Sequence, residues 1–339
     1  MRSKALHPAR HSDIQSTLAK SEGLDTVRSI LNTLTIDDIP PLLHQMTDEH
    51  FHISGKMVRA RLALAVGEAY GVQRGHMAPW GAAVELVHNA TLVHDDIQDE
   101  DTTRRGQPTA WVRHGPAQAI NLGDYFLMMV NHVIDQVVSE EAVKWYLSRA
   151  LTRRASATVA GQVRDLQLGP DSDWTWEAYR KAVEGKTGHL IALPVEGSLL
   201  MARFAPEQAR SVADLFLTVG VLYQYQDDVL DVFGDKQRGQ VACDLYEGKV
   251  SALVVADSLL HPNEEPALRE LLRTPRHQTC EHEVARVIKR FHEGGALDMV
   301  LDQMRELRDA FWANDWGELE NVAQDLVDAT VKPIQAVWS

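Results

Sequence analysis

Two aspartate clusters that stand far apart in the chain share one spacing. Residues 95–99 read DDIQD and residues 227–231 read DDVLD, and each cluster closes a long apolar stretch. Residues four apart share a face of a helix, so Asp95 and Asp99 should project side by side. Such carboxylates repel each other, more so at a helix C-terminus, unless a cation lies between them. The pattern therefore predicts sites for Mg²⁺, a hard cation that binds carboxylate oxygens together with substrate phosphates.

All six aspartates of the two clusters are candidate metal ligands. They are Asp95, Asp96, Asp99, Asp227, Asp228 and Asp231. Asp96 and Asp228 are turned away by about 100° along a helix, so they can support the other ligands or take a neighbouring ion. The alternative is that each cluster is a solvated helix end. That alternative is weaker because the pattern occurs twice, each time after an apolar helix and before basic residues.

Basic residues that could bind phosphate lie close to these clusters in the sequence or near expected helix starts. Arg104 and Arg105 are adjacent in a polar loop, and each guanidinium can bind a phosphate through two hydrogen bonds. Lys56 and Arg59 are three residues apart near an expected helix start, where backbone amides also attract anions. Lys249 directly precedes another expected helix.

Two further positions can be interpreted in more than one way. Lys186 and Thr187 lie in the middle of an expected helix, where a lysine usually extends along the surface to water. Flanking glycines leave room for a ligand to approach Lys186, which favours a functional role. His88 lies two turns before Asp95 on the same helix face. A lone helical histidine is more often a core residue, and only these neighbours favour ligand binding.

Apolar residues at helical spacing run through almost the whole chain, and strand-like alternation is rare. This pattern predicts an all-α fold with one domain over residues 1–339 and a possible helical extension over 1–35. The expected helices are 13–33, 38–51, 56–70, 76–99, 116–138, 139–168, 175–202, 206–232, 250–260, 281–293, 295–313 and 316–335. The polar stretches 100–115 and 233–249 are expected to be loops within the domain.

Composition restricts the class of protein. The hydrophobic fraction of 45% can supply a large core, and the net charge of −14 argues against a nucleic-acid partner. Cys243 and Cys280 lack metal-type spacing and fit a reducing compartment. No apolar run is long enough for a membrane span, and the first residues lack the apolar core of a signal peptide. The cytoplasm is the expected location.

In combination, these motifs resemble those of the trans-isoprenyl diphosphate synthases, over about residues 50–255. The matching residues are Gly55, Lys56 and Arg59; Asp95, Asp96 and Asp99 with Arg104 and Arg105; Gly161, Gln162 and Asp165; Lys186 and Thr187; Gln224 with Asp227, Asp228 and Asp231; and Asp244, Leu245, Gly248 and Lys249. The resemblance implies an isoprenoid-synthase bundle of about ten to thirteen helices around a central apolar cavity.

The resemblance also implies a reaction and roles for its residues. An allylic diphosphate (dimethylallyl, geranyl or farnesyl) would be joined head-to-tail, in trans, to isopentenyl diphosphate, with three Mg²⁺ ions per active site. Isopentenyl diphosphate would be bound by Lys56, Arg59, His88 and Arg105, and the allylic diphosphate by Arg104, Lys186 and Lys249. Thr187 and Gln224 would face the developing allylic cation. A homodimer is implied, with the 116–138 helix and the last helices as candidate interfaces.

Four positions depart from the family pattern. Ser54 stands where a glycine is usual, and Ala60 where a proline is usual. Trp111 stands where many members have histidine. Gln240 replaces a lysine that many members carry, which removes a positive charge expected near the allylic phosphate.

The expected chemistry is ionisation of an allylic carbon–oxygen bond. Metal ions and fixed cations would stabilise the departing diphosphate, and a dry apolar pocket would protect the carbocation from water. No residue stands out as a general base, and the resemblance assigns the final proton to the released diphosphate.

Residues before the first cluster are expected to set product length. Ala90 and Thr91 are small, with Val87 one turn further down, and in the family small residues here suggest longer products than farnesyl. Phe126 on the facing helix forms either a lower floor or ordinary core packing. The expected product is geranylgeranyl diphosphate, with farnesyl or longer polyprenyl diphosphates as alternatives.

Other functions remain to be compared with this one. A class I terpene cyclase would replace the second aspartate motif with an Asn/Ser/Glu-type triad and would have no second substrate for Lys56 and Arg59. A non-catalytic regulatory subunit would be expected to lose aspartates from one motif. Irregular coupling of two allylic diphosphates is a further enzyme alternative.

Overall fold

The computed structural model describes residues 17–53, 55–234 and 241–334, and its regular structure is almost entirely helical. The α-helices are α1 Leu24–Asn32, α2 Pro41–His52, α3 Val58–Ala69, α4 Arg74–Gln98, α5 Ala110–His114, α6 Pro116–Ile134, α7 Glu141–Gln167, α8 Trp176–Val183, α9 His189–Met201, α10 Pro206–Leu215, α11 Leu217–Phe233, α12 Cys243–Tyr246, α13 Ala252–Leu260, α14 Glu265–Arg273, α15 Glu281–Glu293, α16 Ala296–Trp312 and α17 Glu320–Val331. The strands β1 Thr103–Arg104 and β2 Gln107–Pro108 form one antiparallel hairpin. The all-α prediction is confirmed.

Several predicted helices are divided in the structure. The predicted 175–202 helix consists of α8, a π-helical segment at Glu184–Gly188, and α9. The predicted 206–232 helix is split between α10 and α11, and α14 was not predicted. The start of the predicted 13–33 helix and the end of the predicted 316–335 helix lie outside the described residues. The interpretation of residues 1–339 as one domain stays a prediction.

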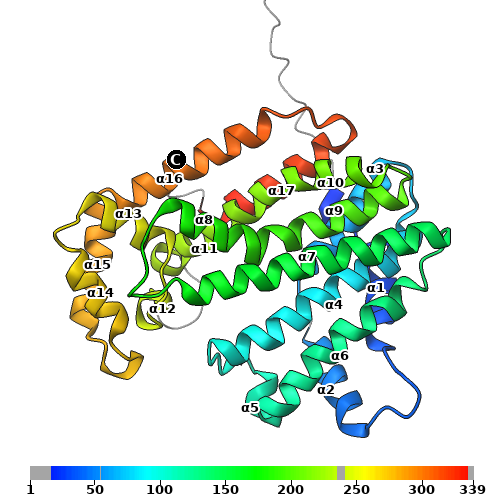
Figure 1. Cartoon of the computed structure of the whole chain (residues 1–339), viewed down its shortest axis with the longest axis horizontal. Helices are drawn as coiled ribbons and strands as arrows, with labels where there is room; N and C mark the ends of the chain where they lie inside the picture. Colours follow the sequence, from blue (N-terminus) through cyan, green and yellow to red (C-terminus); the bar gives the residue numbers. More distant parts are fainter. Residues whose placement is uncertain (1–16, 54, 235–240, 335–339) are drawn as a thin grey trace, which may run out of the picture.

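Long helices run through the middle of the molecule and place the motif residues (Figure 1). α4 packs against α3 and α6, and α7 packs against α9. The π-helical segment contacts both α7 and α11. α14 and α15 lie together at one end of the view, far from α1. The aspartate motifs therefore come from α4 and α11, two central helices.

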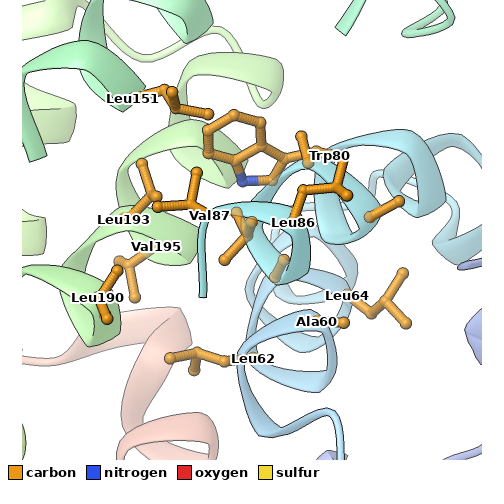
Figure 2. Packing of buried hydrophobic residues seen from close by; sticks show 14 of the residues in the cluster. Ala60, Leu62, Leu64, Trp80, Leu86, Val87, Leu151, Leu190, Leu193 and Val195 are labelled. Carbon is orange, nitrogen blue, oxygen red and sulfur yellow. The ribbon is translucent and has the colours of Figure 1, made fainter. Parts of the chain in front are cut away.

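Large apolar side chains from α3, α4 and α9 fill the space between these helices (Figure 2). Trp80 is fully buried, and its indole nitrogen donates a hydrogen bond to the Pro194 carbonyl oxygen at 3.1 Å. Gly197 makes room for this ring, because a Cβ there would lie 2.0 Å from it. Burying one leucine or valine side chain of this cluster stabilises the fold by roughly 1.5–3 kcal/mol. Val87 belongs to this packed core and has no exposed surface.

Glycines allow three central segments to approach closely. A Cβ on Gly161 of α7 would lie 2.1 Å from the backbone nitrogen of Lys186, and a Cβ on Gly220 of α11 would lie 2.4 Å from the Gly188 Cα. The π-helical segment is therefore held between α7 and α11 by backbone contact. Short π segments inside helices occur often at functional sites, and this one presents Lys186 and Thr187.

No helix in the described part of the chain is long and apolar enough to cross a membrane. The cytoplasmic location stays a prediction.

The backbone contact at Gly161 predicts the effect of a single methyl group. Gly161→Ala should lower the free energy of unfolding by about 1–3 kcal/mol, because overpacking displaces α7 from the π-helical segment. Thermal unfolding followed by circular dichroism measures this. Gly75→Ala is the matched control, since its Cβ would meet nothing within 4 Å. Equal unfolding temperatures for the two variants would contradict the close approach.

Candidate active site

The first aspartate motif ends α4, and two lysines from other segments neutralise it. Asp95 Oδ1 lies 3.2 Å from Lys186 Nζ and accepts a 2.8 Å hydrogen bond from Gln162 Nε2. Asp99 Oδ2 lies 2.9 Å from Lys249 Nζ. Because Lys249 follows the second aspartate motif in the chain, this ion pair connects the two motif regions. Lysines are especially stabilising here, because a helix C-terminus carries partial negative charge.

Asp96 points away from Asp95 and pairs with an arginine. Its Oδ1 accepts a 2.6 Å hydrogen bond from Arg104 Nε. Burial raises the pKa of Asp96 to about 6, although the hydrogen bond and charge of Arg104 act in the opposite direction. Asp96 therefore fixes Arg104, and this contact favours a supporting role over direct metal binding.

A tight hairpin turn separates the two adjacent arginines. Arg105 and Gly106 have φ angles of 52° and 75° between the paired residues Arg104 and Gln107. Positive φ at both central positions is typical of the type I′ turn, which suits two-residue hairpins. The turn directs Arg104 to Asp96 and directs Arg105 to the Ile53 carbonyl oxygen, which accepts its hydrogen bond at 3.1 Å.

In the second motif, Asp228 accepts hydrogen bonds from groups of the protein itself. Its oxygens accept hydrogen bonds from the Tyr179 hydroxyl, from Gln224 Nε2 at 3.1 Å and from the Ala252 backbone N–H at 2.6 Å. Burial raises the pKa of Asp228 to about 7, against the hydrogen bonds that lower it. Asp228 is thus placed to position its neighbours, and its role as a metal ligand stays a prediction.

The other residues of the second motif lie at the end of α11. Asp227 is half-buried, and Asp231 is 4% exposed and accepts a 3.0 Å hydrogen bond from the Asp244 backbone N–H. Gln224 accepts a long hydrogen bond from the Thr187 hydroxyl at 3.4 Å. The Lys-Thr pair of the π-helical segment therefore contacts both motifs, Lys186 on the α4 side and Thr187 on the α11 side.

A first cavity of about 310 Å³ contains every residue predicted to bind isopentenyl diphosphate. Its lining includes Lys56, Arg59, His88 and Arg105, together with Tyr223 of α11. Arg59 Nε and His88 Nδ1 are buried there and have no hydrogen-bond partner in the protein. Buried polar atoms without partners are rare in folded proteins, so this cavity is suited to a polar ligand.

A second cavity of about 440 Å³ adjoins the first motif. Polar residues in its lining include Asp95, Arg104, Lys186 and Thr187. The apolar residues in its lining are Leu92, Val159, Val163, Leu166 and Leu190. Arg59, His88, Arg105 and Tyr223 line both cavities. The two cavities are thus neighbours with a shared wall.

The predicted chain-length residues are placed differently from one another. Thr91 lines the second cavity, whereas Val87, Ala90 and Phe126 line neither of the two cavities and are fully buried. The Phe126 ring packs on Phe51 at a centroid distance of 5.0 Å, and Phe51 lines the first cavity. This geometry favours core packing for Phe126 over a floor beneath the product chain.

Two of the four departures from the family pattern, Ala60 and Trp111, lie in the described residues, and each has a local explanation. Ala60 is buried, and its backbone N–H donates a 3.0 Å hydrogen bond to Glu85 Oε1, which a proline could not do. The Trp111 indole nitrogen donates to the Asp101 carbonyl oxygen at 2.8 Å. Ser54 and Gln240 lie outside the described residues.

Residues near the cavities that the sequence reasoning missed are Tyr223, Glu85 and Arg28. Tyr223 directly precedes Gln224, and this adjacency was the available signal. Glu85 lies three residues before His88, one turn away on the same helix. Arg28 comes from α1, and no motif connects it with the site.

The carboxylates have the chemistry that Mg²⁺ requires, but they do not form a complete cage. In the described residues, no three acidic, histidine or cysteine side chains converge enough to hold a metal ion by themselves. The hard oxygens of Asp95 and Asp99 fit Mg²⁺, which commonly takes one or two carboxylates and completes its shell with water and substrate phosphate. The residues fit a metal ion that binds together with a diphosphate.

Comparison with known proteins gives one consistent result. A family model described as polyprenyl synthetase matches residues 40–291. A short chain isoprenyl diphosphate synthase of Methanothermobacter thermautotrophicus is 32% identical over 278 residues, which are 80% of this chain and 84% of the relative. The octaprenyl diphosphate synthase of Escherichia coli is 28% identical, over 75% of this chain and 77% of the relative. Other relatives are named geranylgeranyl and farnesyl diphosphate synthases.

A solved structure shows the same architecture. The polyprenyl synthetase from Streptomyces coelicolor A3(2) superimposes with a TM-score of 0.80 at 25% identity, covering 91% of this chain and 96% of that chain. The fold and the two motif-bearing helices define a chain-elongating isoprenyl diphosphate synthase. The chain belongs to the polyprenyl synthetase family and is a trans-prenyltransferase.

The ion pair at Asp95 predicts a loss of activity without a loss of fold. Asp95→Asn should lower kcat by about 100-fold or more, because a carboxylate expected to hold Mg²⁺ beside the leaving diphosphate is lost. Asp165, 2.8 Å from Lys186 Nζ, still holds that lysine, so the unfolding temperature should stay nearly unchanged. Steady-state kinetics and thermal unfolding measure the two effects. Asp135→Asn at the end of α6 is the control, and similar kinetics in both variants would contradict the assignment.

Proposed function

We propose that the chain joins an allylic diphosphate to isopentenyl diphosphate, head-to-tail and in trans, and makes geranylgeranyl diphosphate. The observation that carries this proposal is the pair of adjoining cavities with a shared wall. One cavity offers cations for a diphosphate, and the other offers the first aspartate motif beside an apolar wall. Two substrates bound in this way would meet at Arg59, His88, Arg105 and Tyr223.

The first cavity suits isopentenyl diphosphate. Lys56, Arg59 and Arg105 supply positive charge for its diphosphate. Burial lowers the pKa of His88 well below its ordinary value, so its imidazole is neutral near pH 7 and can donate a hydrogen bond through one ring nitrogen. Glu85 accepts the Ala60 N–H and so fixes the start of the helix that carries Arg59.

The second cavity suits the allylic diphosphate. Lys186 and Lys249 already lie against the first aspartate motif, where a diphosphate bound with metal would be placed. Mg²⁺ held by the aspartates would act as a Lewis acid on the diphosphate and so favour its departure. We expect three such ions, with Asp95, Asp99, Asp227 and Asp231 as the ligands and Asp96 and Asp228 in supporting positions.

Side chains of the protein would then stabilise the carbocation and shield it from water. Thr187, which lines the second cavity, and Gln224, which accepts a hydrogen bond from its hydroxyl, would offer oxygen atoms whose electron pairs stabilise positive charge. Buried apolar side chains of the cavity such as Leu190, which is 4% exposed, would keep water away from the cation. The double bond of isopentenyl diphosphate attacks, and the released diphosphate accepts the proton that is lost.

We expect the wall of the second cavity near Thr91 to set the product length. Thr91 is a small residue of the second cavity, and its hydroxyl donates to the His88 carbonyl oxygen at 2.7 Å. A chain that grows past Thr91 along the apolar wall of α7 can exceed the farnesyl length. This argument favours geranylgeranyl diphosphate among the products named for the relatives.

We also propose a homodimer formed through α6 and its surroundings. Apolar side chains on and after α6 are exposed, including Met128 at 73% and Trp145 at 63%. Exposed apolar patches often mark interfaces between proteins.

The terpene cyclase alternative is less well supported. A cyclase takes one substrate, and it would leave the cationic first cavity without a ligand. A non-catalytic subunit would not need the aspartates of both motifs. Assay of the chain alone distinguishes these functions, because only the proposed enzyme consumes isopentenyl diphosphate.

Product sizing tests the proposed chain length. The protein with Mg²⁺, isopentenyl diphosphate and each allylic starter should give geranylgeranyl diphosphate as the main product. Thr91→Phe should shorten the product, since the new ring would fill part of the second cavity and block the growing chain. Chromatography of the dephosphorylated alcohols measures both outcomes.

Thr152→Phe is the matched control for that experiment. Thr152 is exposed on α7, does not line either cavity, and also donates to a backbone carbonyl oxygen, that of Ser148 at 2.9 Å. Its product should be the same as that of the unmodified chain. A main product of farnesyl length in the unmodified chain, or an unchanged product in Thr91→Phe, would defeat the length proposal.

A further inference from the structure

One wall of the first cavity comes from outside the family motifs. α1 contributes Arg28, Leu31 and Asn32 to the lining that also includes Lys56 and Arg59. α1 packs against α4, the helix that carries His88. A segment near the N-terminus therefore completes a site whose other cations come from the motifs.

The placement of α1 beside the site is fixed by a second arginine. Arg61 Nε donates to the Lys56 carbonyl oxygen at 2.9 Å, and its Nη1 donates to the Leu18 carbonyl oxygen at 2.9 Å. Burial lowers the pKa of Arg61, and the nearby charge of Arg28 lowers it further. The loop with Lys56 and the segment that leads into α1 are thus held by one guanidinium group.

Among the described residues, the ion-pair partner of Arg28 is a weak one. Its Nη1 lies 2.9 Å from Asp25 Oδ1, one turn earlier on α1, and the Asp25 side chain is 90% exposed. Exposed ion pairs of this kind contribute roughly 0–1 kcal/mol. The Arg28 guanidinium can therefore leave Asp25 for a stronger anion at little cost.

The charge balance of the first cavity favours such an anion. Its cationic side chains are Arg28, Lys56, Arg59 and Arg105, and the carboxylate in its lining is that of Glu85. The two histidines of the lining do not add charge near pH 7, because burial lowers the pKa of His50 to about 4 and that of His88 well below its ordinary value. The excess positive charge matches a diphosphate group, and a guanidinium can bind phosphate oxygens through two hydrogen bonds.

We infer that Arg28 is a substrate-binding residue that contacts the diphosphate of isopentenyl diphosphate from α1. This inference rests on the proposed function, because it names a further contact in the same site. It also gives α1 a role in binding isopentenyl diphosphate. The allylic diphosphate, bound at the first aspartate motif, should not depend on Arg28.

Steady-state kinetics with each substrate varied in turn test the inference. Arg28→Met should raise KM for isopentenyl diphosphate roughly three- to tenfold, as expected for the loss of one charged contact that is partly exposed. KM for the allylic diphosphate and kcat at saturation should stay within about twofold of the unmodified chain. Arg28→Lys, which keeps the charge but loses the planar fork, should give an intermediate KM.

Two control variants separate binding from helix stability. Arg305→Met removes an arginine with the same arrangement, paired with Asp302 one turn earlier on α16, and should leave both KM values unchanged. Asp25→Asn removes the partner of Arg28 and should leave KM for isopentenyl diphosphate unchanged or lower it. Thermal unfolding of each variant monitors the fold.

The outcomes distinguish this inference from the function on which it rests. If the unmodified chain does not consume isopentenyl diphosphate, the proposed function itself is wrong. If the chain is active but Arg28→Met behaves like Arg305→Met, or Asp25→Asn raises KM as much as Arg28→Met, Arg28 does not bind the substrate.

Discussion

The site depends on ion pairs between the aspartates of the first motif and lysines from other segments of the chain. Lys186 lies between Asp95 and Asp165, and Lys249 reaches Asp99. Burial lowers the pKa of Lys186, but the carboxylates of Asp165 and Asp95 raise it above its ordinary value overall. Without these cations, several carboxylates would lie together at a helix end and repel each other. The lysines thus offset this repulsion and hold the aspartates together.

The backbone provides this arrangement through close contact between glycines. Gly161 and Gly220 let α7 and α11 touch the two sides of the π-helical segment, which carries Lys186 and Thr187. Lys186 is thereby held against α4, and Thr187 against α11. A single segment contacts both aspartate motifs and lines the second cavity, which shares a wall with the first. Under the proposed function, this arrangement would bring the ionising and attacking partners into one place, which is the main requirement for a reaction between two bound substrates.

Much of the fold and the site could be predicted from the sequence, because their signals are local. Helical periodicity predicted α4 and α7 closely, and the first DDxxD motif was predicted to close a long apolar helix, as it closes α4. The π-helical segment was not predicted, because a π turn has the same apolar pattern as the α-helix around it. Arg28 could not be predicted, since its place in the first cavity depends on how α1 packs on α4. Phe126 has the right residue type for a chain-length floor, but its position against Phe51 is set by α2.

Lysines and metal ions should compete for the same carboxylate oxygens of the first motif, and a measurement of metal binding tests this competition. Electron paramagnetic resonance can measure Mn²⁺ bound to the protein with and without inorganic diphosphate, corrected for Mn²⁺ bound to diphosphate alone. We expect diphosphate to tighten the apparent Kd for Mn²⁺ by about five- to 150-fold, because it draws Lys186 and Lys249 away from the aspartates. Equal Mn²⁺ affinity with and without diphosphate would contradict it.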